Sequence, residues 1–348
     1  MRIAIVNDVK MAVESMRRII VSMPEHEVAW VSLNGMEAVR RCAQDVPDLI
    51  LMDLIMPEMN GVEATREIMA RTPCPILVVT SSVTDNVSLV FEAMGAGALD
   101  AVSTPMIGPS GDGRGRDDLL KKIHTIDRLN AATRQRPGHK FHESARLGAT
   151  DRWLLALGAS TGGPGALAAI LSRLPRDLPA SVVIVQHVDE HFIPGLAQWL
   201  NTQSNMPVRL AREGDRLVPG TALVAATNDH LYINEAGRLG YKSEPVKTPY
   251  RPSVDVFFDS VLGHWSGEVC AALLTGMGRD GADGLLRLRR HGAYTVAQNA
   301  ETCKVYGMPK AAVELNAASD VLPVDDIADA LTGRILGEPP KRKKIRFV

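Results

Sequence analysis

Several features that define whole classes of protein are scarce in this chain of 348 residues. It has four scattered cysteines, with no CxxC motif and no cysteine–histidine pairing at zinc spacing. This pattern argues against a disulfide framework or a zinc site and predicts reduced thiols in a cytoplasmic protein. No apolar run reaches the roughly 20 residues that span a bilayer, and the opening MRIAIVND lacks the parts of a signal peptide. We therefore expect a cytoplasmic protein without membrane insertion.

An excess of charge of one sign is also missing. The net charge is -1, so no global attraction to nucleic acid or to a membrane surface is expected. A basic segment, KRKKIRF, is the local exception, and residues 341–348 are interpreted as a solvated basic tail. Residues 152–348 contain no helix-turn-helix pattern with a basic recognition helix, which disfavours a nucleic-acid partner.

The first part of the chain alternates short apolar strands with helical patterns. RIAIV, EVAWVS, DLILMD, CPILVVT and ALDAV are the expected strands, and a helix over 117–132 follows a glycine-rich loop at 106–116. Strands separated by helices predict a parallel, doubly wound sheet. We assign residues 1–130 to this domain and residues 131–150, which lack periodicity, to a linker.

A second domain is predicted over residues 151–340. WLLAL, ASVVIVQ, EVCAALLT and AYTVAQ are its main strands, with helical runs between most of them. Residues 207–245 differ, because PVRLA, GTALVAAT and HLYINEAGRLGYKS are short alternating segments with turn signals, expected to form antiparallel hairpins. The fold class is therefore α/β, with two doubly wound parallel-sheet domains, the second carrying an antiparallel hairpin insertion.

Two aspartates follow strands of the first domain. Asp8 ends IVND, and Asp53 ends LILMD and runs into LIMPEMNG. Carboxyl ends of neighbouring parallel strands form the ligand crevice of such a sheet, and two carboxylates there would hold Mg²⁺. A carboxylate beside Mg²⁺ can accept a phosphoryl group, to which Thr80, at the end of ILVVT, would hydrogen-bond. The alternative is that both aspartates only begin loops.

This constellation resembles the receiver domain of response regulators, which are flavodoxin-like. The resemblance implies phosphorylation of Asp53, with a histidine kinase as phosphodonor. Two positions depart from the receiver pattern: Asn7 stands where a second acid is usual, and Thr104, in STP, stands where a lysine is usual. Without that lysine the phosphoryl oxygens lack a cation, which would weaken phosphoryl binding or the switching response.

The stretch LGASTGGPGAL lies between a strand and a helix of the second domain. It lacks the lysine of a Walker A loop and breaks the dinucleotide fingerprint, but Gly158, Ser160 and Gly162 match the G-x-S-x-G nucleophile elbow. Ser160 is thus a candidate nucleophile. A serine that merely caps the helix is the alternative.

A serine nucleophile needs a base and an orienting acid. His187 ends VVIVQH and Asp280 lies in the turn of LLTGMGRDG, so three strand ends carry Ser, His and Asp at one edge of the sheet. His187 as a core histidine and Asp283 as the acid are the alternatives. GMGRDG as a phosphate loop is disfavoured by its own acid. Backbone N–H groups near Met277 and at the helix start would bind an oxyanion, with Thr161 supporting the turn.

The order Ser, His, Asp differs from that of the α/β-hydrolases. LGASTGG, VIVQH and LLTGMGRDG after a receiver domain resemble the chemotaxis-type protein-glutamate methylesterases, the CheB family. The resemblance implies a Rossmann-like esterase domain and hydrolysis of glutamate methyl esters on cytoplasmic helices of methyl-accepting chemoreceptors. It also implies deamidation of certain glutamines, stimulation by receiver phosphorylation, and no cofactor at the esterase site.

The sequence also shows a finer likeness within this family and is compatible with two other functions. IVND, LMDLIMPEMNG and GALDAVSTP are similar to WspF, the subgroup of a surface-sensing pathway. The alternative functions are a non-catalytic, phosphorylation-dependent binding regulator and a small-molecule esterase.

Overall fold

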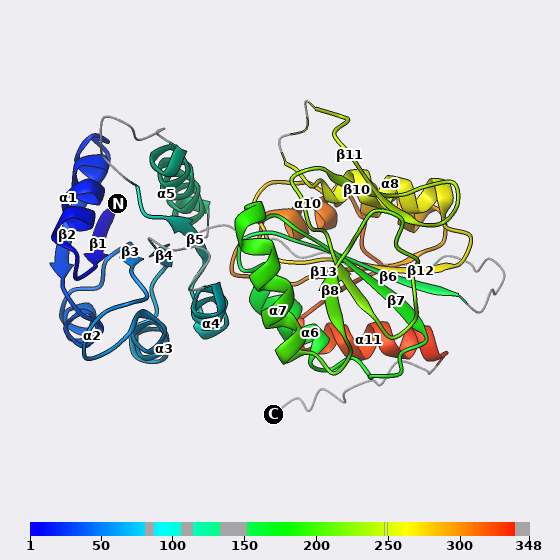
Figure 1. The fold of residues 1–348 in the computed structure, drawn as a ribbon, viewed down its shortest axis with the longest axis horizontal. Helices are drawn as coiled ribbons and strands as arrows, with labels where there is room; N and C mark the ends of the chain where they lie inside the picture. The colour runs from blue at the N-terminus through cyan, green and yellow to red at the C-terminus, as the bar shows by residue number, and fades with distance from the viewer. Residues whose placement is uncertain (81–86, 106–113, 133–151, 247, 249, 338–348) are drawn as a thin grey trace. The chain divides into compact units, whose positions relative to one another are not determined.

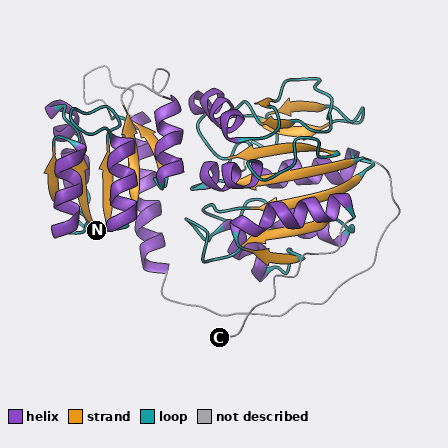
Figure 2. Cartoon of the chain, turned by 90° about the horizontal axis from the view of Figure 1, so that it is seen from below, coloured by secondary structure: helices purple, strands orange, loops and turns teal. Residues whose placement is uncertain are grey.

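The structure is a computed structural model that describes residues 1–80, 87–105, 114–132, 152–246, 248 and 250–337. The chain divides into two compact units, Met1–His139 and Lys140–Val348. Each unit is an α/β layer structure in which helices cover both faces of a parallel sheet (Figure 2). The predicted linker at 131–150 falls almost wholly outside the described residues, as does the basic tail at 341–348.

The first unit contains a five-stranded sheet in the order β2-β1-β3-β4-β5, with all pairs parallel (Figure 1). Its strands are β1 (Arg2–Val6), β2 (Glu27–Ser32), β3 (Leu49–Met52), β4 (Ile76–Thr80) and β5 (Asp100–Ser103). Its helices are α1 (Lys10–Val21), α2 (Gly35–Gln44), α3 (Gly61–Arg71), α4 (Val87–Ala96) and α5 (Arg114–Ala132). Helix α5 begins at Arg114, so the last three residues of the predicted loop at 106–116 are helical, and 106–113 are not described.

Strands β1, β3 and β4 are buried over almost their whole length, which explains their continuous apolar runs. One face of the sheet packs against α1 and α5 through a core that includes Ile5, Met16, Leu51 and Ile123. A capping box at Asn60 fixes the start of α3, eight residues after β3. Because β1, β3 and β4 pair in parallel, their carboxyl ends lie at one edge of the sheet.

The second unit contains a seven-stranded sheet in the order β14-β13-β12-β6-β7-β9-β8, in which every pair is parallel. Its strands are β6 (Trp153–Ala159), β7 (Ala180–Gln186), β8 (Val208–Leu210), β9 (Ala222–Val224), β12 (Glu268–Leu273), β13 (Tyr294–Gln298) and β14 (Asp320–Leu322). Its helices are α6 (Gly163–Leu171), the 3-10 helix η1 (Glu190–Phe192), α7 (Ile193–Gln203), α8 (Val254–His264), α9 (Ala282–Arg290), α10 (Met308–Glu314) and α11 (Val324–Leu336).

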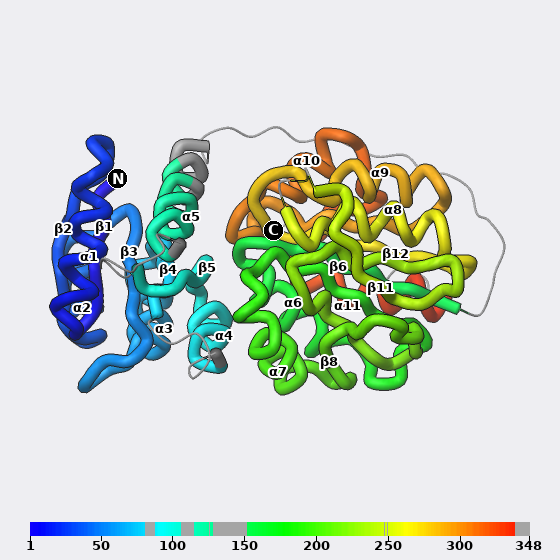
Figure 3. Tube along the Cα trace, turned by 45° about the horizontal axis from the view of Figure 1, so that its top comes forward, coloured from blue at the N-terminus to red at the C-terminus, as the bar shows by residue number. Residues whose placement is uncertain are grey.

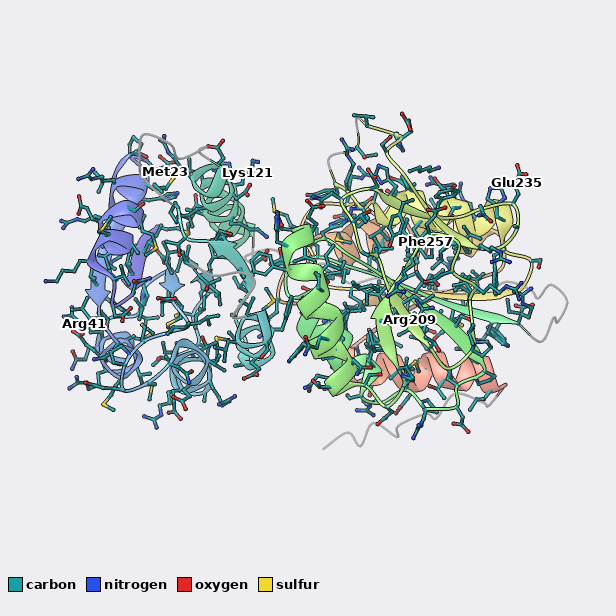
Figure 4. The ribbon with its side chains drawn as sticks, viewed as in Figure 1. Met23, Arg41, Lys121, Arg209, Glu235 and Phe257 are labelled. Atoms are coloured by element: carbon teal, nitrogen blue, oxygen red, sulfur yellow. The ribbon has the colours of Figure 1, made fainter. Side chains whose placement is uncertain are left out.

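Helices α8 and α9 lie side by side (Figure 3) and close the core on one face. Phe257 of α8 is fully buried in this core, whereas Glu235 lies at the periphery of the unit (Figure 4). Strand β6 is central, with β7 on one side and β12 on the other. The chain continues from β6 to β7 in one direction and from β12 to β13 in the other, so the carboxyl end of β6 is a topological switch point, where ligand crevices form.

The prediction of antiparallel hairpins over 207–245 was wrong for its first two segments. PVRLA and GTALVAAT supply β8 and β9, which pair in parallel with each other and extend the main sheet through β7. Only β10 (His230–Ile233) and β11 (Leu239–Lys242) form an antiparallel hairpin. Three-residue strands are too short for an alternation pattern to distinguish the two pairings.

Within the described residues, no helix is both long enough and apolar enough to cross a membrane.

Candidate active site

The turn after β6 is tied to its neighbours by backbone hydrogen bonds. The N–H of Ser160 donates to the carbonyl of Thr275, which follows β12, at 3.0 Å. On the other side, the N–H of His187, directly after β7, donates to the carbonyl of Ala159 at 3.0 Å. Ser160 and His187 are therefore held at the same sheet edge, as the sequence predicted.

Small residues make this turn possible. Gly162 has a φ of 76°, in the left-handed region that favours glycine. A Cβ at Gly276 would lie 2.6 Å from the Cβ of Ser160, so the strand-end backbone approaches the serine closely. The N-cap of α6 is Gly162 and has no side-chain cap bond, which excludes the alternative that Ser160 serves as that cap.

His187 and Asp280 form a buried pair. The Nε2 of His187 lies 2.8 Å from the Oδ2 of Asp280, and the two side chains are 8% and 9% exposed. With Asp280 ionised, Nε2 carries the ring proton and donates it, which leaves Nδ1 unprotonated. Among the described residues, Nδ1 of His187 is buried without a hydrogen-bond partner. A buried, unpaired nitrogen beside the Ser160 turn is the atom available to act as a base.

The carboxylate of Asp280 is surrounded by donors. Oδ1 accepts from Ser253 Oγ at 2.7 Å and from the N–H of Asp255 at 3.2 Å, and Oδ2 also accepts from the N–H of Val254 at 2.7 Å. Burial opposes ionisation, but the hydrogen bonds and charge of His187, with those from Ser253 and Val254, outweigh it and lower the pKa of Asp280. These donors belong to the first turn of α8, whose N-terminus favours a negative charge.

Asp283, the rival acid, lies elsewhere. Asp283 belongs to α9, its side chain is 46% exposed, and it pairs with Arg279 at 3.4 Å. Asp280 instead precedes Gly281, which has a φ of 87° and caps α9. The structure thus brings His187 together with Asp280. No hydrogen bond joins the Ser160 hydroxyl to either within the described residues, and such bonds are often long before substrate binds.

Three contact residues were missed by the sequence reasoning. Ser253 caps α8 and donates to Asp280, and Tyr250 stacks on the ring of His187 with centroids 4.5 Å apart and planes 3° apart. Gln186 Nε2 donates to the carbonyls of Ser160 and His187, at 2.8 and 3.0 Å. Ser253 before an apolar helical run is a recognisable cap, but nothing in the sequence reveals that its hydroxyl also reaches Asp280.

The predicted oxyanion residues flank the serine. Met277 is half-buried, and its backbone N–H makes no hydrogen bond among the described residues. Gly276, just before it, is fixed by an N–H donated to Val305 and by a carbonyl that accepts from Met308 at 2.8 Å. The carbonyl of Thr161 accepts from Thr275 Oγ1 at 3.0 Å, which links the serine turn to the Met277 turn.

The first unit has a second candidate site at the carboxyl edge of its sheet. Asp53 follows β3, is 9% exposed and accepts from the N–H of Leu54 at 2.7 Å. Burial raises the pKa of Asp53 to about 6, and the negative charge of Asp8 contributes to the rise. Thr80 ends β4 and is 1% exposed. Two carboxylates that repel each other here fit a hard divalent cation that retains several waters, since it would relieve their repulsion.

The two departures from the receiver pattern have local structural consequences. Asn7 Oδ1 accepts from the N–H of Val9 at 2.8 Å, so its amide is used at the start of α1. The N–H of Thr104 donates to the carbonyl of Thr80 at 2.9 Å, which places Thr104 at the Asp53 edge. Lys122 pairs with Asp100 at the opposite end of β5 and does not replace the missing lysine.

Two protein-family models match different parts of the chain. Residues 155–331 match the family model described as CheB methylesterase, and residues 3–108 match that of the response regulator receiver domain. A protein-glutamate methylesterase/protein-glutamine glutaminase of Burkholderia thailandensis is 53% identical over 343 residues, 99% of this chain and 100% of the relative. One from Burkholderia orbicola is 56% identical over 332 residues, 95% of this chain and 98% of the relative.

A crystal structure of the CheB methylesterase catalytic domain of Thermotoga maritima is 34% identical, with a TM-score of 0.49, and covers 52% of this chain and 97% of its own. The full-length sequence matches, together with the two family models, show that the chain belongs to the CheB methylesterase family, whose catalytic domain here follows a response regulator receiver domain.

Proposed function

We propose that this chain hydrolyses the methyl esters of glutamate side chains, and deamidates certain glutamines, on cytoplasmic helices of a methyl-accepting chemoreceptor. The observation that carries the proposal is the buried His187–Asp280 pair at the switch-point edge where Ser160 is held. The names of the relatives, which specify protein glutamate and glutamine, support this substrate class. The site of action would be the cytoplasm, where such receptor helices lie.

The proposed chemistry begins with acylation. Ser160 Oγ attacks the ester carbonyl carbon, and Nδ1 of His187 takes the hydroxyl proton. The negative oxygen of the tetrahedral intermediate accepts from the N–H of Met277, which is unpaired among the described residues. The bond to the methoxy group then breaks, and the proton on His187 passes to it, so that methanol leaves and an acyl-serine remains.

Deacylation reverses these roles. His187 takes a proton from water, which attacks the acyl carbon, and Ser160 leaves with that proton to give free glutamate. With glutamine as substrate, ammonia leaves in place of methanol. Asp280, ionised because of its hydrogen bonds, stabilises the positive charge that His187 carries in both steps.

Regulation is proposed to act through Asp53. A histidine kinase would supply the phosphoryl group, which Thr80 would contact through its hydroxyl. The phosphoryl group, with a charge of about -1.5 to -2, would replace the single charge of the carboxylate and bias the receiver between two states. Asp8 and Asp53 would hold Mg²⁺, which when bound neutralises charge on the transferring oxygens. Labelling by a cognate kinase that persists in Asp53→Asn would contradict this assignment.

The decisive test is methanol release from membranes that contain methylated receptor, with the wild-type chain and with Ser160→Ala. We expect release by the wild type and none above background by Ser160→Ala. A non-catalytic binding regulator would release none in either case. A small-molecule esterase would prefer soluble methyl esters to receptor membranes, and either result would overturn the proposal.

A further inference from the structure

The ring of Tyr250 lies flat against the imidazole of His187. The centroids are 4.5 Å apart and the planes differ by 3°, so the two rings are stacked. Burial raises the pKa of the Tyr250 phenol, and the negative charge of Asp280 raises it further. The ring therefore remains a neutral phenol, whose face attracts a positive charge placed over it.

Hydrogen bonds restrain His187 at three further atoms. Asp280 holds Nε2 at 2.8 Å, the backbone N–H donates to Ala159, and the backbone carbonyl accepts from Gln186. Tyr250 covers a face of the imidazole, which hydrogen bonds in the plane of the ring do not reach. With Nε2 and this face occupied, Nδ1 is the polar atom that remains open for a proton from Ser160.

The segment that carries Tyr250 is anchored on both sides by a buried histidine of β10. His230 is fully buried, and its Nδ1 accepts from the N–H of Ser253 at 3.1 Å. Its Nε2 lies 3.2 Å from the carbonyl of Pro245 and 3.1 Å from Thr248 Oγ1. Since Nδ1 accepts, the proton of the neutral ring is on Nε2, and burial lowers the pKa of His230 in favour of this form.

We propose that Tyr250 is a positioning residue for the esterase reaction, held over His187 by the contacts of His230 with Pro245, Thr248 and Ser253. The stacked ring fixes the plane of the imidazole and stabilises it most when it carries a positive charge. His187 gains a positive charge when it takes the proton of Ser160, so the contact favours the transition state selectively. This inference rests on the proposed function, because it assigns His187 the role of base.

The test compares Tyr250→Phe and Tyr250→Leu in the full-length chain. Tyr250→Leu keeps an apolar side chain but removes the aromatic face, and we expect kcat for receptor methyl esters to fall about tenfold, or ~1.4 kcal/mol of transition-state stabilisation. KM should stay within about twofold, since the ring contacts His187 rather than the ester. Tyr250→Phe keeps the face and should retain wild-type kcat within about twofold.

A second readout separates this proposal from the proposed function. The rate at which a fluorophosphonate labels Ser160 reports the reactivity of the serine–histidine pair on any substrate. We expect Tyr250→Leu to slow labelling about tenfold and Tyr250→Phe to leave it unchanged. If the wild type releases no methanol but this labelling pattern holds, the proposed substrate fails while the role of Tyr250 stands.

Two further variants complete the experiment. Thr248→Val removes the hydroxyl that contacts His230 and should slow labelling about threefold. Tyr232→Leu, on β10 with His230 but with its ring under Lys242, should leave labelling unchanged. The proposal is overturned if Ser160 is labelled as slowly in Tyr250→Phe as in Tyr250→Leu, or if Tyr250→Leu changes KM without changing kcat. It is also overturned if all folded variants are labelled at the same rate.

Discussion

Two buried aspartates, one in each unit of this protein, have their ionisation shifted in opposite directions. Asp53 directly follows β3, Asp280 lies in the turn between β12 and α9, and each residue is 9% exposed. Burial raises the pKa of Asp53 to about 6. The pKa of Asp280 is lowered, although burial acts on it in the same direction.

The difference lies in the donors. The negative charge of Asp8 adds to the cost of ionising Asp53, and among the described residues the backbone N–H groups of Leu54 and Ile55 favour the charge. Asp280 has the ring of His187, the hydroxyl of Ser253 and the first N–H groups of α8. A cation or a phosphoryl group at Asp53, as proposed, would relieve the cost of its buried charge, whereas Asp280 already has hydrogen-bond donors that do so.

The largest expected effect comes from the substitution Asp280→Asn. A neutral amide removes the charge that stabilises protonated His187 and disturbs its tautomer, so kcat should fall by about 10³–10⁴. Receptor methyl-ester hydrolysis measures the loss. Asp283→Asn, which changes an exposed acid three residues away, is the matched control and should stay within about twofold. Equal losses in both variants would contradict the assignment of Asp280.

The next largest effect on activity is expected for Gly276, which packs against Ser160, the proposed nucleophile. A Cβ at Gly276 would lie 2.6 Å from Ser160 Cβ and 2.4 Å from Met308 Sδ, so Gly276→Ala should displace the serine and lower kcat about 10²-fold. The receiver has a counterpart, since a Cβ at Gly61 would lie 2.0 Å from the carbonyl oxygen of Asp53. Gly61→Ala should impair labelling of Asp53 by a cognate kinase.

The control for both glycine variants is Gly263→Ala. Gly263 is the second-last residue of α8, and a Cβ there meets nothing within 4 Å. Alanine loses less conformational freedom on folding than glycine, so this variant should keep full activity and unfold at the same or a slightly higher temperature. Full activity in Gly276→Ala as well would mean that the serine turn tolerates displacement.

The sheets and one side-chain contact could be predicted from the sequence. The parallel sheets of both units were predicted from apolar runs that end in polar residues, because buried strands leave that pattern. His187 and Asp280 were predicted to meet because carboxyl ends of parallel strands share an edge. Confirmation of the fold class and of this contact came from sheet topology and from the distance between the two side chains.

Contacts across long sequence separations could not be predicted in the same way. Ser253 lies 27 residues from Asp280, and Tyr250 lies 63 residues from His187, in a segment with no periodic pattern. Likewise, β8 and β9 are too short to reveal that they pair in parallel. The sequence provides candidates for the reacting groups, while the residues that contact these candidates depend on tertiary packing.

A third prediction concerns stability. Because the pKa of Asp53 is raised, its contribution to stability is present below its unfolded value of 3.8 and is lost as the pH rises through about 6. At pH 8 the buried charge is a penalty, so Asp53→Asn should raise the free energy of unfolding of the receiver by about 2 kcal/mol. The gain should shrink at pH 5, where the native carboxyl is mostly protonated.

Urea unfolding of the full chain at the two pH values, followed on receiver peptides by pulsed hydrogen exchange, measures this effect. Asp280→Asn provides the contrast. This substitution replaces an ionised hydrogen-bond acceptor with a neutral one, which should destabilise the second unit at pH 8. The decrease in the free energy of unfolding should become smaller as the pH falls through the lowered pKa of Asp280. If Asp53→Asn instead destabilised the receiver at pH 8, the conclusion that the pKa values of Asp53 and Asp280 are shifted in opposite directions would be contradicted.

The smallest effect is expected when a lysine gives the receiver site a permanent positive charge, as His187 and other donors support the charge of Asp280 in the second unit. Thr104 follows β5 and is tied to Thr80 at the Asp53 edge, so the side chain of Thr104→Lys would extend toward bound phosphoryl oxygens. We expect beryllofluoride, a phosphoryl mimic, to bind about three- to tenfold more tightly, as measured by calorimetry with Mg²⁺ present. Ser103→Lys adds the same charge one residue earlier, where strand alternation directs the side chain to the opposite face. If Ser103→Lys tightens binding equally, net charge rather than a placed cation is responsible, and Thr104 does not explain any weakness of this receiver.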